Sequence, residues 1–238
     1  MPAFVAIDGE KGGVGKSFTC QALVSWALQR RIPVVVVDAN DNIPDVARRY
    51  NGLVPVHVVS VKEEGGWTKV IDIAADCRTS LKTGILALNL PGNVLTSYPE
   101  QRTTMFRFMK QRLGYRNTLV WTMDLGEDVV VQLGHGLAPI IEFVEGRIAL
   151  RNTVWGEPEK FTAWSNSRMR KRFLEVGGVD ASFPRLWREV ARLISRPGVT
   201  TYREHNPSLM GYGEYAVLED WIARADGVFD QLRPCIGV

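Results

Sequence analysis

Short apolar runs alternate along this chain with longer segments in which apolar residues recur at helical spacing. The runs are nearly continuous, which is typical of parallel strands buried on both faces. They cover residues 3–8, 34–38, 54–61, 84–90, 118–123 and 147–152, and we expect the last of them to be the final core strand. The pattern predicts an α/β fold, with a mostly parallel twisted sheet and helices on both of its faces.

The segments between and after these runs predict the helices. The first, from Ser17 to Gln29, presents Ala22, Leu23 and Trp26 on one face, and the last is an amphipathic helix over residues 214–232. Internal repeats and linker-like stretches are absent from the sequence. We therefore expect a single domain over residues 1–238, made of a core (1–155) and a helical C-terminal part (156–238).

A glycine-rich segment, GEKGGVGKS at residues 9–17, lies between the first predicted strand and the first predicted helix. Glycine tolerates backbone angles that side chains forbid, so successive N–H groups can turn inward onto a phosphate. Lys16 adds a positive charge for the outer phosphates, the Ser17 hydroxyl is a ligand for Mg²⁺, and the helix contributes the positive end of its dipole. The segment predicts a phosphate-binding loop.

The form of this loop is unusual, because Glu10 stands where the first glycine is common and Lys11 precedes the paired glycines. KGGVGKS resembles the deviant Walker A motif of the ParA/MinD superfamily, P-loop ATPases of the SIMIBI type, and especially its small members from plasmids and conjugative elements. The resemblance implies ATP or ADP and Mg²⁺ as cofactors. It also implies an ATP-dependent homodimer in which Lys11 reaches the partner's phosphates.

The resemblance also assigns roles to individual positions. It implies that Asp38 and Asn40 occupy the family's Asp-x-Asp pair, whose second acid helps to activate the attacking water. An amide cannot take that proton, so we expect slow hydrolysis, with Asp41 as an alternative carboxylate one residue away. The catalytic candidates are Lys11, Lys16, Asp38, Asn40 and Asp41.

A second acid of the family is also replaced by an amide. Residues 84–92, GILALNLPG, resemble the Walker B strand and the loop after it, and Asn89 stands at the position of the usual aspartate. Asp124, which ends the run 118–123, is a rival for that position, and we prefer Asn89 because Leu-Pro-Gly follows it. The implied metal ligands are Ser17, Asp38 and Asn89, two of them uncharged and therefore weak for a hard cation.

The base of the nucleotide is expected near the ends of later strands. In the family an asparagine after the last core strand binds the adenine edge, and Asn152 stands at that position. The loop at residues 183–186, which includes Pro184, corresponds to one that borders the base. The implied nucleotide-binding residues are thus Gly12, Gly13, Val14, Gly15, Lys16, Ser17, Phe18, Asn152 and Pro184.

Composition narrows the class of protein further. Of the 238 residues 45% are hydrophobic and 23% are charged, the net charge is +3, and no apolar run is long enough to span a bilayer. We expect a cytoplasmic protein with no membrane partner. The three cysteines are widely spaced and form no metal pattern. Basic residues gather between 168 and 196, where they can line one helix face for a DNA backbone or, equally, form a solvated face paired with Glu175 and Glu189.

Two classes of function follow from these observations. In the first, the chain is an ATP-switched dimer of the partition or positioning type that binds DNA non-specifically, a conjugation complex or an adaptor protein, and hydrolyses ATP slowly. In the second, it is a nucleotide-binding regulatory or scaffold protein with almost no hydrolysis. Neither the cargo nor the biological process can be read from the residues.

Overall fold

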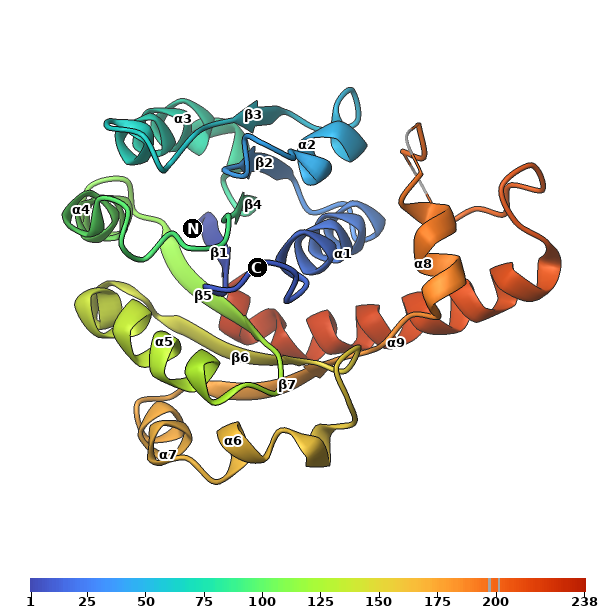
Figure 1. Cartoon of the computed structure of the whole chain (residues 1–238). Helices are drawn as coiled ribbons and strands as arrows, with labels where there is room; N and C mark the ends of the chain where they lie inside the picture. The colour runs from blue at the N-terminus through green and yellow to red at the C-terminus, as the bar shows by residue number, and fades with distance from the viewer. Residues whose placement is uncertain (197, 201) are drawn as a thin grey trace.

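The structure is a computed structural model that describes residues 1–196, 198–200 and 202–238. Its seven strands are β1 (Ala3–Asp8), β2 (Val34–Asp38), β3 (Val56–Val58), β4 (Ile85–Asn89), β5 (Arg116–Met123), β6 (Gly146–Asn152) and β7 (Val179–Phe183). They form one sheet in the order β3-β2-β4-β1-β5-β6-β7, and every neighbouring pair is parallel (Figure 1). The prediction of an α/β fold in a single domain is confirmed.

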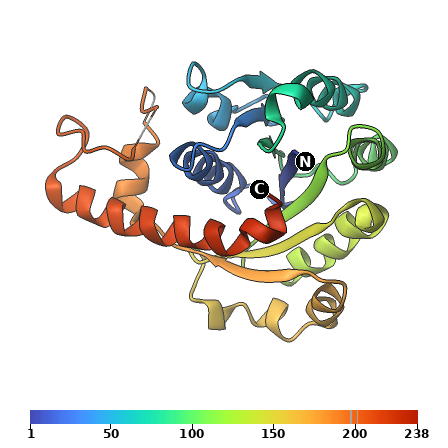
Figure 2. The same ribbon diagram turned by 180° about the vertical axis from the view of Figure 1, so that it is seen from behind.

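Helices cover both faces of this sheet (Figures 1 and 2). One layer contains α1 (Lys16–Gln29), α8 (Arg188–Ile194) and α9 (Tyr212–Ile236), with α2 (Asp45–Tyr50) packed beside α1. The opposite layer contains α3 (Gly66–Leu81), α4 (Pro99–Gln111), α5 (Glu127–Leu137), α6 (Thr162–Ser165) and α7 (Arg168–Glu175). Two short 3-10 helices lie at Ala138–Phe143 and Pro158–Lys160.

The central strand β1 explains why the sheet has two cores. Ala3, Val5 and Ile7 face the α1 and α9 layer, whereas Phe4 and Ala6 face the α3 and α4 layer, and all five are fully buried. Side chains alternate between the faces of a strand, so a strand covered on both sides favours apolar residues at successive positions. This is the physical basis of the continuous apolar runs.

The prediction from the sequence pattern was wrong at the edge of the sheet formed by β7. The segment 156–238 was expected to be helical and β6 was expected to be the last strand, but β7 lies in that segment and pairs with β6. Only Phe183 of β7 is buried, and the other four residues of this edge strand are partly or fully exposed. Its mixed sequence, VDASF, therefore lacked the apolar run that marked the other strands.

β7 also separates the two groups of basic residues. One group lies on α7, whose Phe173 packs into the core on one side of the sheet: Arg168, Arg170, Lys171 and Arg172. The other group, Arg188 and Arg192, lies on α8, whose Val190 packs into the core on the other side. The expectation that the basic residues between 168 and 196 line one helix face is therefore wrong.

Candidate functional site

The glycine-rich loop leaves β1 and enters α1 through two residues with left-handed backbone angles. Gly13 has φ +80° and Gly15 has φ +105°, and Gly15 is the N-cap of α1. A side chain at Gly15 would also clash with the side-chain nitrogen of Asn152. Glycine is therefore required here both for its backbone angle and for the close approach of β6. The loop leads directly into the N-terminus of α1, where the first backbone N–H groups have no partner within the helix and can bind an anion.

Lys16 is folded back into this loop. Its ammonium donates to the Gly9 carbonyl (2.6 Å) and to the Lys11 carbonyl (2.8 Å), which leaves one of its three N–H donors for a ligand. The residue is 7% exposed, and burial lowers the pKa of Lys16 to about 8, although the nearby Asp8 and Glu10 carboxylates oppose this shift. A charged lysine buried without a carboxylate partner favours an anion in the adjoining space.

The Asp38 carboxylate at the end of β2 already holds four hydrogen bonds. Its Oδ2 accepts from the backbone N–H groups of Val46 and Ala47 in α2, both at 3.0 Å, and its Oδ1 accepts from the Asn40 N–H (3.3 Å) and from Asn89 Nδ2 (2.8 Å). A carboxylate offers about four lone-pair positions. In this conformation Asp38 therefore fastens β2 to α2 and β4 and has no position left for a metal ion. Burial raises its pKa despite these bonds.

The other two predicted metal ligands do lie together. Asn89 Nδ2 donates to Ser17 Oγ (3.2 Å), so the ends of β4 and α1 meet, and Asn89 Oδ1 is buried with no hydrogen-bond partner among the described residues. Ser17 Oγ therefore faces the amide nitrogen of Asn89, and Asn89 would have to turn its amide to offer Oδ1 to a magnesium ion held by Ser17, phosphate and water oxygens. The described part of the chain contains no cluster of three or more His, Cys, Asp or Glu side chains with metal-site geometry.

Lys11 has a different environment from Lys16. Its ammonium lies 2.8 Å from Asp128 Oδ1 and 3.3 Å from Asp124 Oδ2, and these carboxylates, Asp128 first, raise the pKa of Lys11. Asp124 also accepts from the Gly126 N–H at the start of α5. Asp124 therefore pairs with Lys11 of its own chain, whereas Asn89 is the residue that lies beside Ser17.

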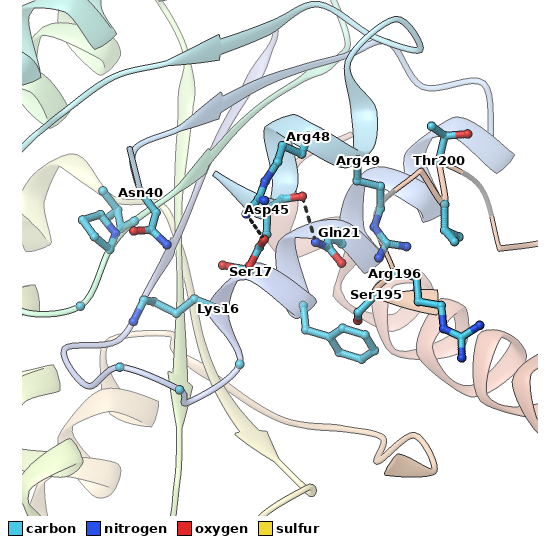
Figure 3. Close-up of a pocket in the computed structure, with 18 of the residues that line it drawn as sticks. Lys16, Ser17, Gln21, Asn40, Asp45, Arg48, Arg49, Ser195, Arg196 and Thr200 are labelled. Carbon is cyan, nitrogen blue, oxygen red and sulfur yellow. Dashed lines mark hydrogen bonds and ion pairs between the residues drawn. The ribbon is translucent and has the colours of Figure 1, made fainter. Parts of the chain in front are cut away.

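A cavity of about 680 Å³ opens beside the loop and extends away from it (Figure 3). Asn40 lines it, with its Nδ2 donating to the Ile43 carbonyl (3.0 Å). Asp41 lies on an exposed turn and does not line the cavity. The carboxylate that does line the cavity is Asp45, which is ion-paired with Arg48 (2.7 Å).

We compared the sequence and the structure of the chain with those of known proteins. No family model matches the chain. The chain is 25% identical over 178 residues to Protein MobD of Acidithiobacillus ferrooxidans, a match that covers 75% of each chain. Among solved structures it resembles a nucleotide-binding protein of Archaeoglobus fulgidus in complex with ADP and with cobalt (TM-score 0.51, 15% identity, 84% of this chain and 88% of that one).

Two further solved structures share the fold. One is the signal recognition particle receptor FtsY of Elizabethkingia anophelis (TM-score 0.52, 13% identity, 93% of this chain and 66% of that one). The other is the cell division protein FtsY of Thermotoga maritima (TM-score 0.50, 16% identity, 68% of this chain and 57% of that one). With the glycine-rich loop between β1 and α1, these likenesses decide the fold. The chain shares the parallel α/β fold of these proteins.

The two residues predicted to border the base of a nucleotide are placed differently from each other. Asn152 braces the P-loop, because its Nδ2 donates to the Val14 carbonyl (2.8 Å) and its Oδ1 accepts from the Val154 N–H (3.2 Å). Pro184 does not line the cavity, and its carbonyl accepts from Trp221 Nε1 (2.8 Å). The contact ties the Pro184 backbone to α9, and the position of Pro184 beside the base stays a prediction.

Several residues that line the P-loop cavity were missed by sequence reasoning. Phe18 was predicted and does line it, with its ring 5.2 Å from that of Trp221. The missed ones come from α1, α2 and the segment after α8: Gln21, Asp45, Arg48, Arg49, Ser195, Arg196, Gly198, Val199 and Thr200.

Proposed function

We propose that this chain is an ATP-binding P-loop ATPase of the ParA/MinD type. The observation that carries the proposal is the loop itself: KGGVGKS with left-handed Gly13 and Gly15, a buried Lys16 with a free donor, and an adjoining cavity. A triphosphate placed there would meet loop N–H groups, one ammonium and a helix N-terminus. The similar protein of Archaeoglobus fulgidus, which was solved with ADP, supports a nucleotide as the ligand.

The proposal includes a Mg²⁺ ion that the protein itself binds weakly. Ser17 would hold the ion through its hydroxyl, and Asn89 would do so through its amide oxygen after the amide turned; the bound ion would neutralise charge on the outer phosphates. Both protein oxygens are uncharged, and Asp38 is committed to α2 and β4. Magnesium would therefore be held mainly by phosphate and water oxygens, which suits a hard cation that dehydrates reluctantly.

Hydrolysis is proposed to be slow. Asn40 is the side chain at the position of the family's water-activating acid, and an amide can orient a water but cannot accept its proton. Asp41 lies outside the cavity, and Asp45 is neutralised in part by Arg48. The ATP-bound state would then persist, as a switch that holds a partner requires.

The switch is proposed to work through dimerisation. Two chains facing each other across two nucleotides need cations between the phosphates, and Lys11 is the cation available at the loop. It would have to leave Asp124 and Asp128 to reach a partner's nucleotide. The dimer would act on DNA or on an adaptor in a partition or conjugation complex, with DNA contacting the arginines of either α7 or α8.

The second candidate function is a nucleotide-binding regulator or scaffold with almost no ATPase activity. The saturated Asp38 carboxylate favours it, because no carboxylate of the Asp38–Asn40 segment is free to act on water. Single-turnover hydrolysis measured with and without DNA separates the two functions. A rate that DNA or a partner accelerates supports the switch, and a rate at the uncatalysed level supports the scaffold.

The central test is nucleotide binding by the wild type and by Lys16→Ala, measured by isothermal titration calorimetry. We expect ATP to bind the wild type and binding to be lost in the variant, because the buried ammonium is removed from the loop. Arg112→Ala, on the exposed end of α4, is a matched control that removes a cation far from the cavity. Equal ATP affinity in wild type and Lys16→Ala would refute a nucleotide site at this loop.

A further inference from the structure

The cavity has a second charged end, away from the P-loop. Gln21 lies one turn further along α1 than Ser17, about 6 Å along the helix axis. Beyond it the lining changes from glycine backbone to side chains of α2 and of the segment after α8, with Arg49, Ser195 and Arg196 around the space (Figure 3). A ligand that occupied this end would have little contact with the loop.

Arg49 is the unusual residue at this end. It is 6% exposed and lines the cavity, yet its Nε and Nη1 are buried with no hydrogen-bond partner among the described residues. Its Nη2 donates to the Ile194 carbonyl at the end of α8 (2.6 Å), and its guanidinium lies 5.3 Å from the centre of the Tyr202 ring. These contacts leave two guanidinium nitrogens without partners, and both are shielded from solvent in this conformation, so a ligand in the cavity reaches them only if the guanidinium turns toward it.

The charge around Arg49 is also unbalanced. Arg48 is paired with Asp45, whereas neither Arg49 nor Arg196 has a carboxylate within 4 Å in the described part of the chain. A buried cation without a counter-ion costs free energy, and an unmet N–H adds to that cost. One oxyanion in the cavity would remove both costs, because it would compensate the charge and, once the guanidinium turned toward it, accept from the unpaired N–H groups. A neutral carbonyl would satisfy the N–H groups and leave the charge uncompensated.

We propose that Arg49, supported by Arg196 and the Ser195 hydroxyl, forms an oxyanion site for a phosphate group, separate from the P-loop. The charge-assisted hydrogen bonds of a guanidinium to phosphate are about twice as strong as neutral ones. The phosphate could be free, or it could belong to a ligand whose other end occupies the P-loop. The site stands on residues of α2 and the segment after α8, so it does not depend on which nucleotide the P-loop takes.

The test counts bound phosphate by equilibrium dialysis with radiolabelled orthophosphate. Lys16→Ala removes the ammonium of the P-loop, Arg49→Met removes the proposed oxyanion site, and the double variant removes both. We expect Lys16→Ala to keep an Arg49-dependent phosphate, and we expect Arg49→Met in that background to weaken phosphate binding about tenfold or more. Arg112→Met, at an exposed site, is the control for loss of one positive charge.

Thermal melting checks that each variant folds, and Arg49→Lys keeps a charge if the methionine variant does not fold. Phosphate binding that Arg49→Met and Arg49→Lys both leave unchanged in the Lys16→Ala background would overturn the proposal. If Lys16→Ala loses ADP binding but keeps the phosphate binding that depends on Arg49, the two sites are separate.

Adenosine 3′-phosphate 5′-diphosphate identifies the source of the phosphate. If it binds more tightly than ADP and this advantage is lost in Arg49→Met, the phosphate is carried by the nucleotide. If it binds as tightly as ADP, the site takes a free anion.

Discussion

The buried Lys16 ammonium makes nucleotide affinity depend on pH in a range that few other side chains reach. Its pKa is lowered to about 8 by burial, from an ordinary value of 10.5. A bound phosphate favours the charged form and raises this pKa again. Ligand binding is therefore linked to protonation of Lys16, and affinity must fall as pH rises through the pKa of the free protein.

The magnitude follows from the fraction of Lys16 that is protonated. With a pKa of about 8, that fraction is about nine-tenths at pH 7 and about one-tenth at pH 9, so affinity for ATP should fall about tenfold, equivalent to about 1.4 kcal/mol. Phosphate groups with a second pKa near 6 are already ionised over this range and do not contribute. At pH 8 binding should take up about half a proton per site.

Calorimetry in two buffers of different ionisation enthalpy measures both the affinity and the proton uptake. Lys16→Arg is the matched variant, because arginine stays charged throughout and should bind with a flat pH profile if it binds. An affinity of the wild type that stays constant from pH 7 to pH 9, with no proton uptake at pH 8, would refute the assignment of Lys16 as the titrating phosphate ligand.

Three further outcomes are expected. Lys11→Ala should still bind one nucleotide per chain but fail to form an ATP-dependent dimer in analytical ultracentrifugation with a non-hydrolysable analogue; a variant that dimerises normally would show that Lys11 is dispensable. Arg102→Ala should lower the free energy of unfolding by about 3–5 kcal/mol in urea titrations, because it leaves the buried Asp8, now 3.0 Å from Arg102, without its partner. Asn40→Asp should speed single-turnover hydrolysis.

The sheet could be predicted because its strands are covered on both sides. β1, β2 and β4 are buried at every position, and their residues are apolar except for the last of each strand, Asp8, Asp38 and Asn89. β7 has one buried residue in five, so no such constraint acted on its sequence. The same rule thus explains why the central strands were found and why the edge strand was missed.

The site could be predicted only where residue type is fixed by the backbone. Gly15 must be glycine because of its φ angle and the contact with Asn152, so the loop is visible in the sequence. The roles of Asp38 and Arg49 depend on what surrounds them. Asp38 accepts hydrogen bonds from N–H groups of α2. Two nitrogens of Arg49 lack a hydrogen-bond partner among the described residues because of the way α2 and α8 pack. Neither packing arrangement has a local signature.

The rate of ATP hydrolysis distinguishes the proposed switch from the proposed scaffold, and we expect this rate to depend on the residue at position 40. Its amide faces the cavity with Nδ2 donating to Ile43, whereas an aspartate there would place a carboxylate at the same position. General-base assistance is worth about a hundred- to ten-thousand-fold, so Asn40→Asp should raise the single-turnover rate well above any change in affinity.

Asp41→Asn is the matched control for the Asn40→Asp experiment and should change nothing, because Asp41 is exposed and outside the cavity. The competing carboxylate is Asp45, which lines the cavity beside Arg48. If Asp45→Asn stops hydrolysis while Asn40→Asp leaves the rate unchanged, then α2 supplies the acid that acts on water. Asn40 would in that case only hold the turn at Ile43, and slow hydrolysis would need another cause.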